Sequence, residues 1–151
     1  MQKDQFKHLF RLRVRNYEVD WQGIVHNANY LLYCETGRIE YLRGLGVKLD
    51  LNSISNENRV VLVRNEINYR ASAYFDEELE ISTRISAIGE TSFIFESMIE
   101  KSRNYELVCD NVAVHVWLNS NREPVRVSDE FRQMVRKFEG SNVILKNQKR
   151  D

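Results

Sequence analysis

The sequence predicts an α+β domain in which an antiparallel sheet of about five strands wraps around one long central helix, followed by a short C-terminal helix. Three observations support this fold class. An alternating run of apolar and polar residues comes first, a single long stretch of helical periodicity follows, and four more alternating runs come after it. Short turn signals between the later runs favour antiparallel hairpins over parallel crossovers, because hairpins need few connecting residues.

Length and composition limit the class of protein. A chain of 151 residues fits one ordinary domain, so residues 1–151 are expected to form a single domain with a polar tail from about residue 139. The 22 basic and 22 acidic side chains cancel, which argues against a nucleic-acid partner. No apolar run approaches the ~20 residues that span a bilayer, and residues 1–15 lack the apolar core of a secretion signal. We therefore expect a cytoplasmic protein with no membrane span.

The cysteines and histidines do not form a metal-binding pattern. Cys34 and Cys109 are widely separated and lie among apolar neighbours, as reduced structural thiols do. His8, His26 and His115 are scattered without the spacing of zinc ligands. No metal site is expected, and no redox cofactor is implied.

The first predicted strand covers residues 6–17. Phe10, Leu12 and Val14 lie on one face and three arginines lie on the other, the pattern of a half-buried strand. This strand leads the chain into a turn at Asp20.

The helical pattern runs from Asn27, a predicted N-cap, to about Gly44, with Gly44 or Gly46 as its stop. Its predicted apolar face consists of Ala28, Leu31, Leu32, Glu35, Ile39 and Leu42. Much of the remaining surface consists of Tyr30, Tyr33, Cys34, Gly37 and Tyr41, so the helix should be largely enclosed. A glycine inside a helix costs ~1 kcal/mol relative to alanine, so Gly37 suggests close approach of another backbone or a ring.

The rest of the chain predicts a meander. Residues 45–58 are expected to be an irregular connection, and strands are predicted at residues 59–69, 78–87, 91–101 and 105–118. Ser128 then caps a short amphipathic helix whose apolar face carries Phe131, Met134, Val135 and Phe138. The polar segment 139–151 is expected to fray.

Residues 17–30 combine a carboxylate, a glycine turn and a helix start. Asp20 can supply a base or a nucleophile for carbonyl chemistry. The backbone N–H groups of Val25, His26 and Asn27 open the helix and are not used by helical bonding, so they can stabilise an oxyanion.

A fixed pattern of residue types runs from this turn along the helix: Asp20-x-x-Gly23-x-Val25-x-Asn27-x-x-Tyr30-x-x-Tyr33-x-Glu35-x-x-Arg38. It resembles the N-terminal signature of the 4-hydroxybenzoyl-CoA thioesterase family, particularly its acyl-CoA thioester hydrolase branch. The resemblance implies a hotdog fold and hydrolysis of an acyl-CoA thioester to free acid and coenzyme A. It also implies that Asp20 is the catalytic carboxylate and that the Asn27 amide polarises the carbonyl. Coenzyme A would enter as part of the substrate, with no separate cofactor.

The same resemblance implies a homodimer or homotetramer with active sites at the subunit boundary. An exposed sheet edge protected by a second copy would fit this assembly.

Further residues near the turn are expected to bind substrate. These are Trp21, Gly23, Val25, His26 and Tyr30. Trp21 stands beside the catalytic carboxylate on a loop. His26 is expected to line the pocket at most, because many members of the resembled branch carry tyrosine or asparagine there.

Other charged residues are assigned more ordinary roles. Glu35 and Arg38 lie three apart on the helix and are expected to form a structural ion pair. His115 is expected to be a core or interface histidine. The coenzyme A phosphates need local cations, and sequence does not choose among Arg64, Arg70, Arg84, Lys101 and Arg103.

Alternative functions stay open. An acyl-carrier-protein thioesterase would act on protein-linked thioesters, and a noncatalytic acyl-CoA-binding hotdog domain would bind without turnover. An aspartate before a glycine turn can also be only a turn former or a cap. A dehydratase is less favoured, because its catalytic histidine has no counterpart here except His26.

Overall fold

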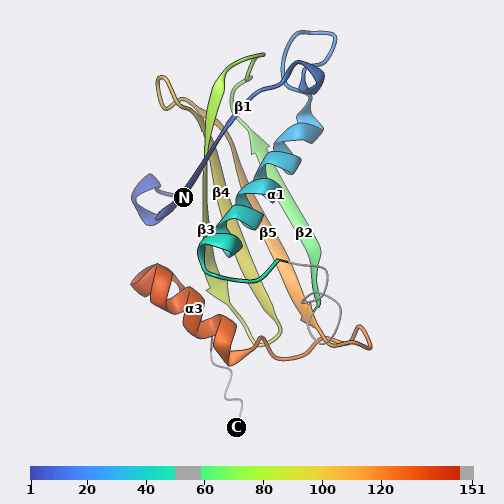
Figure 1. The fold of residues 1–151 in the computed structure, drawn as a ribbon, viewed down its shortest axis with the longest axis vertical. Helices are drawn as coiled ribbons and strands as arrows, with labels where there is room; N and C mark the ends of the chain where they lie inside the picture. Colours follow the sequence, from blue (N-terminus) through green and yellow to red (C-terminus); the bar gives the residue numbers. More distant parts are fainter. Residues whose placement is uncertain (50–58, 147–151) are drawn as a thin grey trace.

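The computed structural model describes residues 1–49 and 59–146. A curved sheet packs against one side of the long helix α1 (Asn27–Gly44), and the second helix, α3 (Asp129–Glu139), lies near the end of the sheet where α1 stops (Figure 1). This arrangement confirms the predicted fold class. Among the described residues, no helix is long and apolar enough to cross a membrane.

Within residues 1–49 and 59–146, the sheet contains five long or medium strands and one short one. They are β1 (His8–Arg13), β2 (Arg59–Tyr69), β3 (Glu78–Ile88), β4 (Ser92–Lys101), β5 (Leu107–Leu118) and β6 (Ile144–Leu145). Their spatial order is β1-β3-β4-β5-β2 with antiparallel pairing throughout, and β6 adds to β3 in parallel. The four later predicted strands therefore lie within one or two residues of their predicted bounds.

The prediction for the first strand was too long. The β1 pairing with β3 ends at Arg13, and residues Asn16–Glu18 form a 3-10 turn instead. The turn forms because the buried Glu18 carboxylate accepts a hydrogen bond from the backbone N–H of Arg15 at 2.8 Å, which closes the chain on itself.

The prediction of a frayed tail was wrong for residues 140–146. A 3-10 turn (Gly140–Asn142) leads into β6, and Lys146 N–H donates to the Ile88 carbonyl at 2.9 Å. Val143 is buried in the core beside α3, which anchors this segment. Residues 147–151 lie outside the described residues, as do residues 50–58 of the predicted irregular connection.

Helix α1 has its predicted bounds but buries a different face. Its buried residues are Tyr30, Tyr33, Cys34, Gly37, Arg38 and Tyr41. By contrast, Leu32 is 56% exposed and Ile39 is 38% exposed, so the predicted apolar face is wrong and the helix is less enclosed than predicted. The sheet covers only one side of the helix, and it covers the side where Gly37 permits the closest approach.

Gly37 does mark a close contact, although side chains rather than backbone or a ring make it. A Cβ at this position would lie 2.7 Å from Ile81 Cγ2 and 2.8 Å from Thr83 Oγ1 on β3. The absence of a Cβ therefore sets how near the helix lies to the sheet.

The predicted Glu35–Arg38 ion pair is not formed. Glu35 is exposed, whereas Arg38 is buried and donates to Asn111 Oδ1 on β5 at 3.4 Å. The two residues point to different environments because only the Arg38 side of the helix meets the sheet.

Candidate active site

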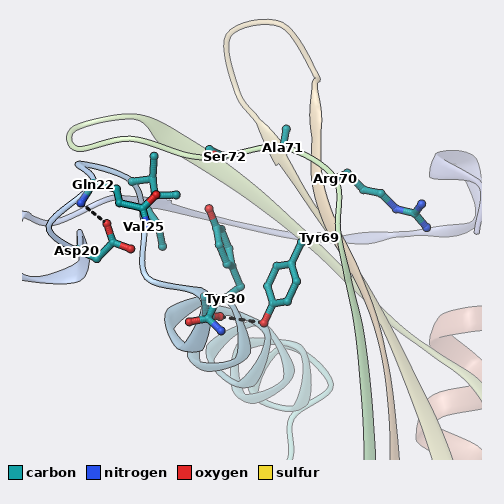
Figure 2. A pocket seen from close by; sticks show the side chains of 10 residues that line it. Asp20, Gln22, Val25, Tyr30, Tyr69, Arg70, Ala71 and Ser72 are labelled. Atoms are coloured by element: carbon teal, nitrogen blue, oxygen red, sulfur yellow. Dashed lines mark hydrogen bonds between the residues drawn. The ribbon is translucent and has the colours of Figure 1, made fainter.

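A cavity of about 410 Å³ lies at the start of α1 (Figure 2). Its lining comes from three segments that are distant in sequence. The loop before α1 contributes Asp20, Gln22, Ile24 and Val25, the first turn of α1 contributes Asn27 and Tyr30, and the end of β2 with the following segment contributes Tyr69, Arg70, Ala71 and Ser72. We call this space the Asp20 cavity.

The Asp20 loop is held as a tight turn. Asp20 N–H donates to the Ile24 carbonyl at 2.9 Å, and Gly23 N–H donates to the Asp20 carbonyl at 3.0 Å. Gly23 has φ +79°, a conformation that glycine adopts without steric cost. The predicted glycine turn is thus present, and it acts through its backbone rather than by lining the cavity.

The Asp20 carboxylate is half-buried and partly committed to its own loop. Its Oδ1 accepts from Gln22 N–H at 2.7 Å (Figure 2). Among the described residues nothing else donates a hydrogen bond to this carboxylate. Its second oxygen therefore remains available to a water molecule or a substrate in the cavity.

The amides that open α1 are used unequally. Val25 N–H donates to the Ala73 carbonyl and His26 N–H to the Glu18 carbonyl, each at 2.9 Å. As predicted, helical bonding does not use these two amides, but other carbonyl groups do, so the expectation that they can stabilise an oxyanion was wrong. Both N–H groups are already hydrogen-bonded to carbonyl groups before the helix begins.

The Asn27 amide remains. The N-cap of α1 is His26 rather than the predicted Asn27, and its ring Nδ1 accepts from Ala28 N–H at 3.1 Å. Within residues 1–49 and 59–146, Asn27 N–H has no acceptor, and Asn27 lines the Asp20 cavity. One backbone donor at the positive end of a helix is thus left for a ligand.

Two tyrosines form the wall between the helix and β2. Tyr69 OH donates to the Asn27 carbonyl at 3.1 Å, and Tyr30 OH accepts from Ala73 N–H at 3.0 Å. The ring centroids are 5.8 Å apart, and both rings lie beside the cavity in Figure 2. Burial raises the pKa of both phenols, so they stay neutral hydrogen-bonding groups.

Glu18 fastens the loop to the helix and was missed in the sequence. Its Oε2 accepts from Tyr33 OH at 2.7 Å, and its carboxylate pairs with Arg15. Burial acts to raise the pKa of Glu18, but the hydrogen bonds from Arg15 and Tyr33, together with the charge of Arg15, hold the pKa below its usual value. The side-chain amide of Asn29 also donates to the Glu18 carbonyl, at 2.8 Å. The one sequence signal for this role was the spacing of the pair, since Glu18 lies three positions after Arg15.

The remaining predicted site residues fall into two groups. Val25 and Tyr30 line the Asp20 cavity with the two proposed catalytic residues. Trp21 is 92% exposed and lies outside the lining, and His26 is exposed and outside it as well.

The wall from the end of β2 was not predicted. Tyr69 to Ser72 follow the helix start by some forty positions, and only the fold brings the two together. Of the five cations considered for phosphate binding, Arg70 is the one that lines the cavity. It extends away from Asp20 (Figure 2), with its Nη2 2.9 Å from Asp110 Oδ2.

The other four candidate cations pair with acids outside the cavity lining, Arg64 with Glu66, Arg84 with Glu96, Lys101 with Glu106 and Arg103 with Glu77. Among the residues described by the structure, no group of three or more histidine, cysteine or acidic side chains could hold a metal ion.

Comparisons with known proteins converge on one family. The model of the thioesterase-like superfamily matches residues 14–135. A chloroplastic acyl-acyl carrier protein thioesterase of Arabidopsis thaliana is 30% identical over 138 residues, covering 91% of this chain and 72% of the relative. The acyl-CoA thioester hydrolase YbgC of Escherichia coli is 33% identical over 99 residues, covering 64% of this chain and 72% of the relative.

A solved structure agrees with the sequence matches. A thioesterase from Thermus thermophilus, complexed with coenzyme A and Zn, superposes with a TM-score of 0.78 at 27% identity, covering 91% of this chain and 98% of that one.

Proposed function

This chain belongs to the thioesterase-like superfamily and is a thioester hydrolase, and from this premise we propose that it hydrolyses an acyl-CoA thioester to the free acid and coenzyme A. One observation supports the catalytic assignment above all others. The Asp20 carboxylate and the unpaired Asn27 amide line the same cavity. A base or nucleophile and an oxyanion donor are the two groups that thioester hydrolysis needs.

In the proposed mechanism, the thioester carbonyl oxygen accepts a hydrogen bond from Asn27 N–H. The helix dipole adds to the stabilisation of the negative charge that develops on this oxygen. Asp20 then removes a proton from a water molecule as that water attacks the carbonyl carbon, or attacks the carbon itself to form an anhydride that water cleaves. In either route the C–S bond breaks and the thiolate of coenzyme A takes a proton.

A second candidate differs only in the thiol carrier. The Arabidopsis relative, named for acyl-acyl carrier protein, matches 91% of this chain, whereas the E. coli acyl-CoA hydrolase matches 64%. This coverage favours testing a phosphopantetheine carrier protein beside coenzyme A.

The deciding experiment measures thiol release from short-chain, long-chain and aromatic acyl-CoAs, and from the same acyl groups on acyl carrier protein. Asp20→Asn is the test variant, because its amide oxygen can still accept from Gln22 N–H and preserve the turn. We expect a loss of roughly 100-fold or more in kcat, the scale of a positioned acid-base group. Asp4→Asn, on an exposed N-terminal turn, is the matched control and should retain activity.

Two outcomes would count against this proposal. Thiol release that survives Asp20→Asn unchanged would refute the mechanism. Binding of acyl-CoA by the parent without any turnover would point to the noncatalytic alternative.

We also propose a homodimer formed through β2. In the described part of the chain this strand is hydrogen-bonded on one side only, to β5, and Val60, Val61, Leu62 and Val63 are 39–57% exposed. An exposed apolar edge of this kind favours pairing with a second chain. Antiparallel pairing of two β2 strands about a two-fold axis would place the second copy beside Tyr69, at the margin of the Asp20 cavity.

A further inference from the structure

A second and larger cavity lies at the opposite end of α1. Its volume is about 730 Å³, within the range of small-molecule sites, and it shares no lining residue with the Asp20 cavity. The second half of α1, the start of β2, the inner faces of β4 and β5, and α3 enclose it. We call this space the Arg38 cavity.

Most of its wall is apolar and aromatic. The residues that form this wall include Leu42, Leu62, Phe93, Trp117, Phe131 and Met134. Phe93, Trp117 and Phe131 pack on one another with ring centroids 5.1–6.3 Å apart, so the wall is built from interlocked rings. A surface of this composition suits an apolar ligand body.

One buried cation interrupts this apolar surface. Arg38 is 6% exposed, and its Nη1 donates to the neutral amide oxygen of Asn111 at 3.4 Å. Within the described parts of the chain, no carboxylate lies within ion-pair distance of its guanidinium. A guanidinium carries several N–H donors, and buried charges are normally paired because desolvation is costly. Among the residues that the structure describes, no anion therefore pairs with the buried charge of Arg38.

The other polar groups of the lining do not supply that anion. Glu35 acts on Arg38 through its charge without forming an ion pair, and both Glu35 and Glu130 are exposed, so water screens their charge. Lys48 adds a second cation to the lining. His115 has a buried Nδ1 without a hydrogen-bond partner, and its burial, together with the charge of Arg38, lowers its pKa to about 4, so this ring is neutral at pH 7.

We propose that the Arg38 cavity binds a carboxylate carried on an apolar body, with the carboxylate on Arg38 and the body against the aromatic wall. A neutral oxygen would satisfy N–H donors but leave the buried charge unpaired, whereas a carboxylate does both. Two sources share this chemistry. One is a free monocarboxylic acid, and the other is the distal carboxylate of a thioester formed from a dicarboxylic acid. Binding itself does not depend on the proposed hydrolysis.

The test compares octanoate with 1-octanol, which share an apolar chain and differ in charge. Trp117 lines the cavity and reports binding by fluorescence, and Trp21→Phe leaves it as the single indole. We expect octanoate to bind about tenfold or more tightly than 1-octanol, and Arg38→Met to reduce octanoate affinity to that of the alcohol. Arg38→Lys should keep part of the preference. Arg43→Met, which removes an exposed arginine of the same helix paired with Glu40, should leave it intact.

Two results would overturn the proposal. One is equal affinity of the parent for octanoate and 1-octanol, and the other is an undiminished preference in Arg38→Met. Methionine fills a similar volume and removes an unpaired buried charge, so the melting temperature should not fall. If Arg38→Met does not fold, the comparison of the parent with Arg38→Lys still decides, because a role for Arg38 requires the lysine to weaken octanoate binding.

Kinetics then distinguish the two sources. If the carboxylate is the distal group of a thioester, the preference for suberyl-CoA over octanoyl-CoA should fall about tenfold in Arg38→Met and persist in Arg43→Met. If it is a free acid, octanoate should inhibit the parent and inhibit Arg38→Met much less. Failure of all thioesters to turn over would reject the proposed function, while the octanoate measurement would still decide this inference.

Discussion

Gly37→Ala tests how closely α1 approaches the sheet. The new Cβ would meet Ile81 Cγ2 at 2.7 Å and Thr83 Oγ1 at 2.8 Å, so each neighbour would have to retreat by about 0.6–0.7 Å to restore ordinary contact. Both neighbours are fully buried and β-branched, which limits their freedom to move. Overpacking of this kind costs about 1–3 kcal/mol, and alanine recovers about 1 kcal/mol in helix propensity. We expect a net loss of up to about 2 kcal/mol.

Thermal and urea unfolding at one fixed protein concentration would measure this loss, because association makes the melting temperature depend on concentration. The melting temperature should therefore fall by up to about 8 °C for a chain of this size. Gly44→Ala is the matched control on the same helix, since its Cβ would meet only His8 Cδ2, at an ordinary 3.8 Å. It should leave stability unchanged or raise it by about 0.5–1 kcal/mol. A Gly37→Ala protein stabilised by about 1 kcal/mol, the full gain in helix propensity, would show that α1 does not lie this close to β3.

Two further predictions concern the sheet edge and the second cavity. Sedimentation at micromolar concentration should show at least a dimer, and Leu62→Lys should weaken it by charging the β2 edge; a stable, active monomer would contradict the proposed assembly. His115 has a folded-state pKa of about 4, below the value of about 6.5 in an unfolded chain, so the unfolded state takes up a proton first as the pH falls. The contribution of His115 to stability is therefore full above pH 6.5 and is lost toward pH 4. Melting temperatures across this range should fall less steeply in His115→Gln, and equal slopes would refute the assignment.

Local sequence signals were enough to locate most elements. The bounds of α1 and β2 agree with the structure because a change of periodicity or a turn marks each end. The choice of the buried face of α1 failed, since it counted Leu32 and Ile39 as core, although Gly37 was expected to mark a close contact on the other face. That choice is made by tertiary packing, which periodicity alone does not encode.

The candidate site was predictable only on its local side. Asp20, Val25, Asn27 and Tyr30 sit within one short stretch, and the structure places them around one cavity. The opposite wall is formed by the end of β2 and the segment after it. Its position depends on the pairing of distant strands, and no motif in its own sequence indicates a site. The same holds for Arg38, whose helical spacing suggested a partner at Glu35 while the fold turned it toward the sheet.

The availability of the Asn27 amide follows from what its neighbours do. His26 N–H is taken by the carbonyl of Glu18, and Ala28 N–H is taken by the ring of His26. Asn27 N–H lies between these two amides, and neither a loop carbonyl nor the capping ring accepts a hydrogen bond from it. The donor at this site is thus selected by the loop and by the capping histidine, not by the asparagine side chain. His26 affects the proposed chemistry because its ring accepts the hydrogen bond of Ala28 N–H. One N–H group, that of Asn27, rather than two is therefore left to face a carbonyl oxygen.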